Sequence, residues 1–231
     1  MLPARAGFQD LKTRFSAGAG ALRLAREPLF STAIPAIDAL LGGGIPYGTL
    51  LTIEGCGSAG CRSIAAALLA QGTRHGLGAV IDGGELYPPA LAAAGVRLDR
   101  LLIVPAATPM ALARAADLLL RSRTARVVVM TAGALRAAVW ARLAKLAART
   151  GTVLVVLAAR ASAELSVVAG VRLACRLERA VLRGTRGLWG VFAGFELHAE
   201  VRKHKRACSG EVLVKALTPP VVYGRDEGVS R

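Results

Sequence analysis

Short apolar runs alternate along the chain with segments that repeat apolar residues every three or four positions. The runs are TLLTIE (49–54), GAVID (78–82), RLLIVPA (100–106), RVVVMTA (126–132) and TVLVVLAA (152–159). The intervening segments with helical character are 63–75, PPALAAAGV (88–96), 109–122 and 135–149. Continuous apolar strands that alternate with helices predict an α/β fold whose mostly parallel sheet is covered by helices on both faces.

The pattern changes after residue 170. RLACRLERAVLRG (172–184), WGVFAGFELHAEVRKHK (189–205) and EVLVKAL (211–217) have strand character and are separated by glycines. They predict C-terminal antiparallel strands that extend the sheet. We therefore divide the chain into an N-terminal arm for oligomerisation or docking (1–30), a core (31–217) and a flexible C-terminal tail (218–231).

The composition fits one α/β domain of 231 residues, and 54% hydrophobic residues exclude a disordered chain. Uncharged stretches are broken by Gly and Pro, and no compact signal segment precedes the core, so a cytoplasmic protein is expected. Four cysteines without a C-x-x-C pair predict reduced, mostly buried thiols and no metal site. A Cys56–Cys61 bridge is the alternative.

Positive charge gathers in the second half of the chain. The net charge is +15, and residues 121–206 hold 17 Lys/Arg against 4 Asp/Glu. This asymmetry suggests contact with DNA or an acidic partner, and a nucleoid-associated protein if DNA is bound. A merely solvated Arg-rich surface is the alternative. The candidate contact residues are Arg176, Arg179, Arg183 and Arg186.

The stretch GCGSAGCRS (55–63) lies between an expected strand and an expected helix. A phosphate-binding loop has the form G-x-x-x-x-G-K-[ST], and Gly55 and Gly60 have that spacing, with Gly57 between them. Cys61 then occupies the lysine position and Arg62 the hydroxyl position. Arg62 comes one residue after the lysine position, and Ser63 comes one residue after the hydroxyl position. On a helix, one residue turns a side chain by about 100°, so neither should face the phosphate or the metal.

The carboxylates that such a site needs are also scarce. The strand 126–132 ends in Met130, Thr131 and Ala132, where an acid that supports Mg²⁺ is expected. Glu85, after the strand 78–82, is the one candidate for a residual water-positioning acid. We therefore expect a vestigial phosphate loop with no catalysis and no cofactor, or weak nucleotide binding without hydrolysis.

Three segments in order resemble the RecA-like recombinase superfamily: STAIPAIDALLGGGIPYGTLLTIEGCGSAGCRSIAAALL (31–69), AVIDGGELYPPALAAAGVRLDRLLIV (79–104) and ELHAEVRKHKRACSGEVLVKAL (196–217). The resemblance implies a RecA-like P-loop core. It also implies that Lys203 and Lys205, which match a K-x-K motif, reach a neighbouring subunit's ATP across an oligomer interface. Solvated lysines that protect a sheet edge are the alternative for this pair.

A short RecA-like chain with these substitutions is most similar to the ImuA-type accessory proteins of translesion synthesis. The resemblance implies a non-catalytic adaptor in damage-induced mutagenesis. It would bind a Y-family polymerase-like protein (ImuB-like) and an associated error-prone polymerase, with single-stranded DNA, RecA or further copies of itself as other candidate partners. The alternative is a RecA/KaiC-like DNA-dependent ATPase with a divergent phosphate loop, and ATP and Mg²⁺ enter only under that alternative.

Overall fold

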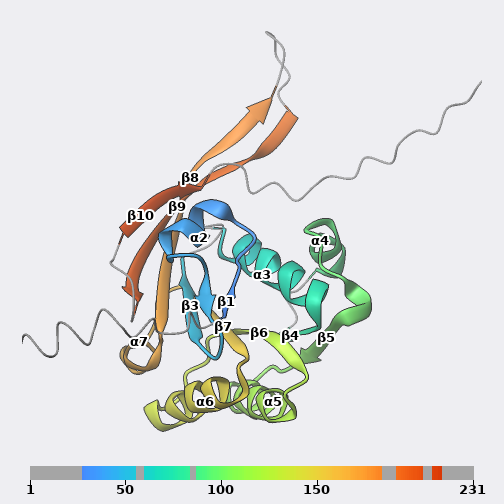
Figure 1. Ribbon diagram of the computed structural model, residues 1–231, viewed down its shortest axis with the longest axis vertical. Coiled ribbons are helices and arrows are strands. Elements are labelled where there is room, and N and C mark those ends of the chain that lie inside the picture. Colours follow the sequence, from blue (N-terminus) through green and yellow to red (C-terminus); the bar gives the residue numbers. More distant parts are fainter. Residues whose placement is uncertain (1–27, 56–59, 84–86, 184–190, 205–209, 215–231) are drawn as a thin grey trace, which may run out of the picture.

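The computed structural model describes residues 28–55, 60–83, 87–183, 191–204 and 210–214. Their main feature is an eight-stranded sheet with the order β10-β9-β8-β3-β7-β6-β4-β5 (Figure 1). The expected tail lies outside the described residues, as does the expected arm up to residue 27. Leu29–Phe30 form β1, which pairs with β2 (Ile45–Pro46).

Five strands form the parallel half of the sheet, as the apolar runs predict. They are β3 (Leu50–Glu54), β4 (Leu77–Asp82), β5 (Leu101–Pro105), β6 (Ala125–Thr131) and β7 (Val153–Ala158). Their side chains are mostly buried except on β5, which is the outer strand. Because these strands are parallel, their carboxyl ends meet at one edge, and the connections that follow them lie together there.

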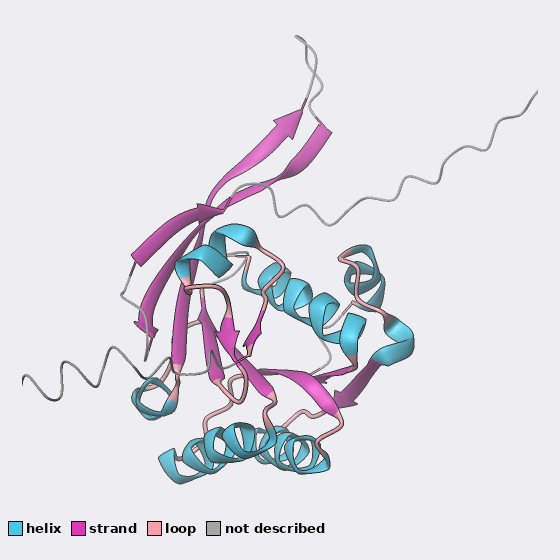
Figure 2. Ribbon diagram, in the orientation of Figure 1, coloured by secondary structure: helices cyan, strands magenta, loops and turns pink. Residues whose placement is uncertain are grey.

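Helices cover both faces of the sheet, and each face has its own apolar core (Figure 2). The helical elements are α2 (Pro35–Leu40), α3 (Cys61–His75), α4 (Pro88–Ala93), η1 (Leu98–Arg100), α5 (Pro109–Ser122), α6 (Ala137–Thr150) and α7 (Ala163–Val168). α3 packs on one face against Leu51 and Ile53, whereas α5 and α6 pack on the other against Val128 and Leu154. None of the described helices is long and apolar enough to cross a membrane.

The remaining strands are β8 (Val171–Arg183), β9 (Val191–His204) and β10 (Gly210–Val214). They are antiparallel to one another, as predicted, but β8 runs parallel to β3 at the junction with the rest of the sheet. β3 pairs only with the start of β8, at 171–174, and β10 pairs with β9 at 197–201. The far end of the β8–β9 ribbon therefore projects from the body (Figure 1).

The α/β fold class with a mostly parallel sheet is confirmed, and the differences are local. α3 begins at Cys61, two residues before its expected start at 63. α6 begins at Ala137, two residues after its own expected start at 135. The short helix α7 has no counterpart among the elements that the sequence pattern predicts. This short helix begins after Ser162, whose hydroxyl accepts a hydrogen bond from the Leu165 N–H, an N-cap interaction that a serine supplies readily.

Candidate functional site at the β3–α3 connection

The expected phosphate loop lies at the carboxyl edge of the sheet, between β3 and α3. The Gly55 N–H donates to the Ala158 carbonyl at 3.0 Å, which joins the start of the loop to the end of β7. Gly57 lies outside the described residues. The strand–loop–helix arrangement is the one that the glycine spacing predicts, so its local chemistry decides what the connection can do.

Gly60 is required by packing as well as by backbone conformation. It precedes α3 with φ of 79°, in the left-handed region that favours glycine. A Cβ at this position would lie 2.3 Å from Cδ1 of Leu197, a fully buried residue of β9. The glycine thus lets α3 approach β9 closely, a role that does not depend on phosphate.

Cys61, at the lysine position, is the first residue of α3 and lies half-buried against the apolar core that includes Cys175 of β8. The two thiols are hydrogen-bonded, and both cysteines are free. The hydrogen bond from Cys175 lowers the pKa of Cys61. The same contact, together with burial, raises the pKa of Cys175. Cys175 is buried, as expected, and Cys61 is half-buried, whereas Cys56 and Cys208 lie outside the described residues.

Arg62 and Ser63 follow on α3, where Arg62 is exposed and Ser63 is half-buried. The acids that such a loop needs have two candidate positions: the end of β6 and Glu85. Thr131 ends β6, so no carboxylate occupies that strand end, and Glu85 lies outside the described residues. Among the described residues, no group of three or more His, Cys, Asp or Glu side chains is arranged to hold a metal ion.

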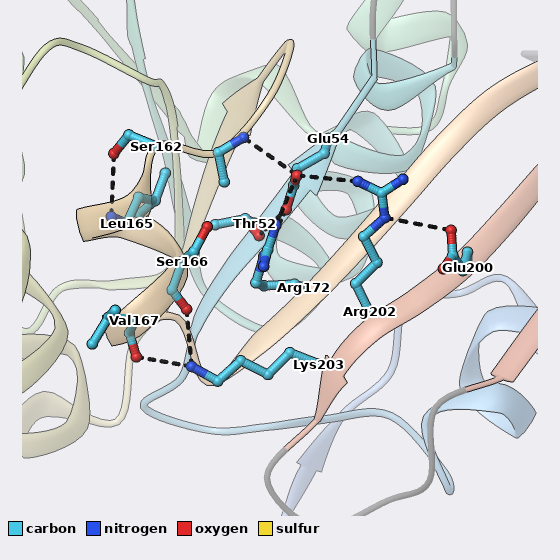
Figure 3. Close-up of polar contacts among 11 residues, drawn as sticks. Thr52, Glu54, Ser162, Leu165, Ser166, Val167, Arg172, Glu200, Arg202 and Lys203 are labelled. Atoms are coloured by element: carbon cyan, nitrogen blue, oxygen red, sulfur yellow. Dashed lines mark hydrogen bonds and ion pairs between the residues drawn. The ribbon is translucent and has the colours of Figure 1, made fainter.

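Glu54, the last residue of β3, is the centre of a polar cluster that sequence reasoning missed (Figure 3). Glu54 is buried, with 2% of its surface exposed. Its carboxylate accepts two hydrogen bonds from Arg172, from Nε at 2.8 Å and from Nη2 at 3.1 Å. The Ala161 N–H donates to it at 3.3 Å, and Arg202 lies 3.8 Å away. Strands β3, β8 and β9 and the segment before α7 are joined through this one side chain.

These contacts fix the charge of Glu54. Burial by itself raises the pKa of a carboxylic acid, because a dry environment disfavours the ion. Here the hydrogen bonds from Arg172 and Ala161 and the charges of Arg172 and Arg202 outweigh burial, so the pKa of Glu54 lies below its ordinary value. Glu54 is an ionised carboxylate that is occupied by partners from its own chain.

A bulge in β9 brings a second cation to the same cluster. Arg172 is paired with Lys203 but Leu173 with Val201, so Arg202 is the extra residue. Side chains alternate along a regular strand, and the bulge lets Arg202 and Lys203 serve the same face of the sheet. The Lys203 ammonium donates to the carbonyls of Ser166 (2.9 Å) and Val167 (2.8 Å) in the last turn of α7.

Lys203 is therefore held against α7 within the subunit, which differs from the expected solvated pair at a sheet edge. Its strand, β9, lies between β8 and β10, and β5 and β10 are the outer strands. Lys205, the second member of the K-x-K motif, lies outside the described residues. The contact with a neighbour's nucleotide remains an expectation from the resemblance.

The arginines expected to contact DNA or a partner are partly neutralised by acids. Arg179 makes two hydrogen bonds to the Glu196 carboxylate, at 2.8 and 3.0 Å, and Arg176 lies 3.3 Å from Glu178. The side chain of Arg183 and all of Arg186 lie outside what the structure describes. The described part of this strand thus presents less free positive charge than its arginines suggest.

Two comparisons with known proteins bear on this arrangement. The model of the family described as "MT3502 N-terminal domain" matches residues 38–163, a segment that runs from α2 into the start of α7. The RecA protein of Nostoc punctiforme (strain ATCC 29133 / PCC 73102) is 36% identical over 112 residues, which are 48% of this chain and 31% of that RecA. The chain therefore spans about a third of the length of its curated relative.

Proposed function

The chain belongs to the MT3502 N-terminal domain family, and we propose that it is a non-catalytic RecA-like adaptor in DNA repair. The observation that carries the proposal is the start of α3, where the free, half-buried thiol of Cys61 occupies the position of the phosphate-binding lysine. A short thiol side chain, which is never positively charged, cannot reach terminal phosphates or balance their charge. Phosphoryl transfer depends almost entirely on positioning and electrostatics, so this substitution removes what catalysis requires.

The polar groups near the loop support the same proposal. In a nucleotide site, cations are available to the ligand. Here Arg172 binds Glu54, and Lys203 binds the end of α7. Both side chains support the fold of their own subunit, so their use for a nucleotide would break contacts that hold the β8–β9 ribbon and α7 to the sheet.

The similarity to RecA supports a role connected with DNA repair. The finer role is an adaptor of damage-induced translesion synthesis that binds a Y-family polymerase-like protein and, through it, an error-prone polymerase. Its N-terminal arm (1–30) and C-terminal tail (218–231) are the candidate docking segments. The adaptor needs only a stable surface for this task, so it works without ATP.

ATP binding and hydrolysis by the purified full chain test the non-catalytic part, with and without single-stranded DNA and with RecA as the positive control. We expect no turnover. ATP hydrolysis that disappears in a Glu85→Ala variant would overturn the adaptor proposal in favour of the divergent ATPase.

Co-purification with the polymerase-like protein tests the adaptor part. We expect a complex that forms without nucleotide and that is lost when either residues 1–27 or residues 218–231 are deleted. A complex that requires ATP, or the absence of a complex with the full chain, contradicts the proposal. The two deletion variants are compared with the full chain by circular dichroism, so that loss of binding is separated from loss of fold.

A further inference from the structure

The helical layer formed by α5 and α6 is the most one-sided charged surface of the described chain. Asp117 is the single acid between residues 101 and 159. The two helices and their ends carry seven cations, and all seven are exposed. They are Arg114, Arg121, Arg123, Arg136, Arg142, Lys145 and Arg149.

The helical repeat places these cations outward. On α6, Trp140, Leu143 and Ala147 are buried against the sheet at spacings of three and four residues. Arg142, Lys145 and Arg149 have the same spacings, displaced by two residues, so they form a stripe on the solvent side. Figure 2 shows α5 and α6 together on one face of the sheet, away from α3.

Asp117 neutralises little of this surface. Its carboxylate accepts from Arg121 at 2.9 Å on its own helix and from Arg142 at 2.8 Å on α6, so it also holds the two helices together. The other five cations have no carboxylate partner among the described residues. On β8, by contrast, Arg176 and Arg179 each have one. The α5–α6 layer therefore carries more positive charge without a carboxylate partner than the described part of β8 does.

We propose that the α5–α6 layer binds the sugar–phosphate backbone of a nucleic acid. Six of its seven cations are arginines, whose planar guanidinium groups bind phosphate oxygens in pairs. The stripe Arg142, Lys145 and Arg149 spans about 10 Å of helix. A nucleic-acid strand has a phosphate roughly every 3.4 Å of helix axis, so this stripe faces several of them.

The rest of the exposed surface of α6 favours this ligand over a protein or a lipid membrane. Its other exposed residues are alanines, without the aromatic or large apolar anchors that protein interfaces use, whereas α5 exposes Met110 and Leu118. The stripe on α6 is therefore the part of the layer that favours a nucleic acid. Its apolar side is buried in the core and cannot enter a bilayer. Phosphate contacts carry no sequence information, so binding is independent of base sequence. The inference deepens the proposed function, because the layer would keep the adaptor on DNA.

The test is the affinity of the full chain for a fluorescent 30-nucleotide strand and the matching duplex, as a function of salt. Lys145→Glu/Arg149→Glu removes two unpaired cations of the stripe. Arg74→Glu/Arg160→Glu is the matched control, because it changes the net charge equally at exposed positions that lie outside the α5–α6 layer and have no carboxylate partner among the described residues. We expect at least tenfold weaker binding for the first variant and less than threefold for the second. We also expect the slope of log K against log salt to fall by about 1.5 in the first variant alone.

Equal effects of the two variants, or no effect of either, overturn the inference. Poly-glutamate and vesicles with anionic lipid, used in place of DNA, separate the classes of ligand. Binding of either one as tight as that of DNA, with the same loss in Lys145→Glu/Arg149→Glu, also overturns it. The polymerase-like partner is then tested with the same variant. Retained partner binding with lost DNA binding supports both proposals, whereas lost partner binding with retained DNA binding overturns the inference and leaves the adaptor role standing.

Discussion

The Arg172 guanidinium and the Glu54 carboxylate form two hydrogen bonds, of 2.8 and 3.1 Å, between residues 118 positions apart in the sequence. Glu54 ends the strand that leads into the loop, and Arg172 lies at the start of the strand that joins the C-terminal ribbon to the sheet. The pair therefore connects the parallel half of the fold to its antiparallel extension at the edge of the sheet where the β3–α3 connection begins.

Truncation of Glu54 should lower the free energy of unfolding more than truncation of an exposed acid does. Glu54→Ala leaves Arg172, whose side chain is only 20% exposed, without its main partner, and the Ala161 N–H without an acceptor. Removing one member of a buried pair costs about 3–5 kcal/mol, measured as the free energy of urea unfolding at neutral pH. The double variant Glu54→Leu/Arg172→Leu should recover part of that loss, since no unpaired buried charge remains.

The control for that measurement is Arg97→Ala, which breaks the exposed pair of Arg97 and Asp99. Exposed ion pairs are well solvated in both the folded and unfolded states, so the urea midpoint should stay close to that of the unaltered chain. If Glu54→Ala and Arg97→Ala shifted the midpoint equally, the Glu54 cluster would have no special structural role.

Acid should remove the contribution of Glu54 to stability. Its pKa is lowered in the folded chain from an ordinary value of 4.5, so the stabilisation is present above that value and is lost as the pH falls through the folded pKa. The gap in unfolding free energy between the unaltered chain and Glu54→Gln should therefore shrink between about pH 5 and about pH 3. Urea titrations at these two pH values measure the gap. A gap of constant size is the opposite result.

The fold was largely predictable from the sequence, because burial on both faces makes parallel strands into unbroken apolar runs. What could not be predicted are relationships between distant residues. Glu54 ends such a run and must find a cation when buried, but nothing local indicates that Arg172 supplies it. The bulge at Arg202 depends on the register between β8 and β9, which the turn glycines do not specify.

The amount of positive charge is visible in the sequence, but which cations have acidic partners is not. The basic character of the second half is visible in the composition, yet the arginines singled out on β8 include two with acidic partners. The spacing of Arg142, Lys145 and Arg149 on a predicted helix is the sequence signal for the cation stripe that the structure shows on α6. The number of acids in each segment distinguishes β8, where the arginines have acidic neighbours, from the α5–α6 segment, where Asp117 is the single acid.

Gly60→Ala should destabilise the chain more than the same change at Gly151. Both glycines have positive φ, 79° and 72°, so alanine pays roughly 1–2 kcal/mol in each place. A Cβ at Gly151 meets nothing within 4 Å, whereas one at Gly60 collides with Leu197. Urea unfolding should show the larger loss for Gly60→Ala, and a smaller difference in a Leu197→Ala background. Equal losses at the two glycines would mean that packing against β9 does not require glycine.

Cys61 should react with iodoacetamide at lower pH than an ordinary thiol, because the thiolate is the nucleophile and the hydrogen bond from Cys175 lowers the pKa of Cys61. Cys175, which is 6% exposed, should react only after unfolding. The measurement is the alkylation rate against pH in a chain with Cys56→Ser and Cys208→Ser, so that only this pair is followed. Replacing Cys175 with alanine removes the hydrogen bond, and the midpoint of the Cys61 profile should then move to higher pH. An unchanged midpoint would show that the thiol contact does not set the reactivity of the residue at the lysine position.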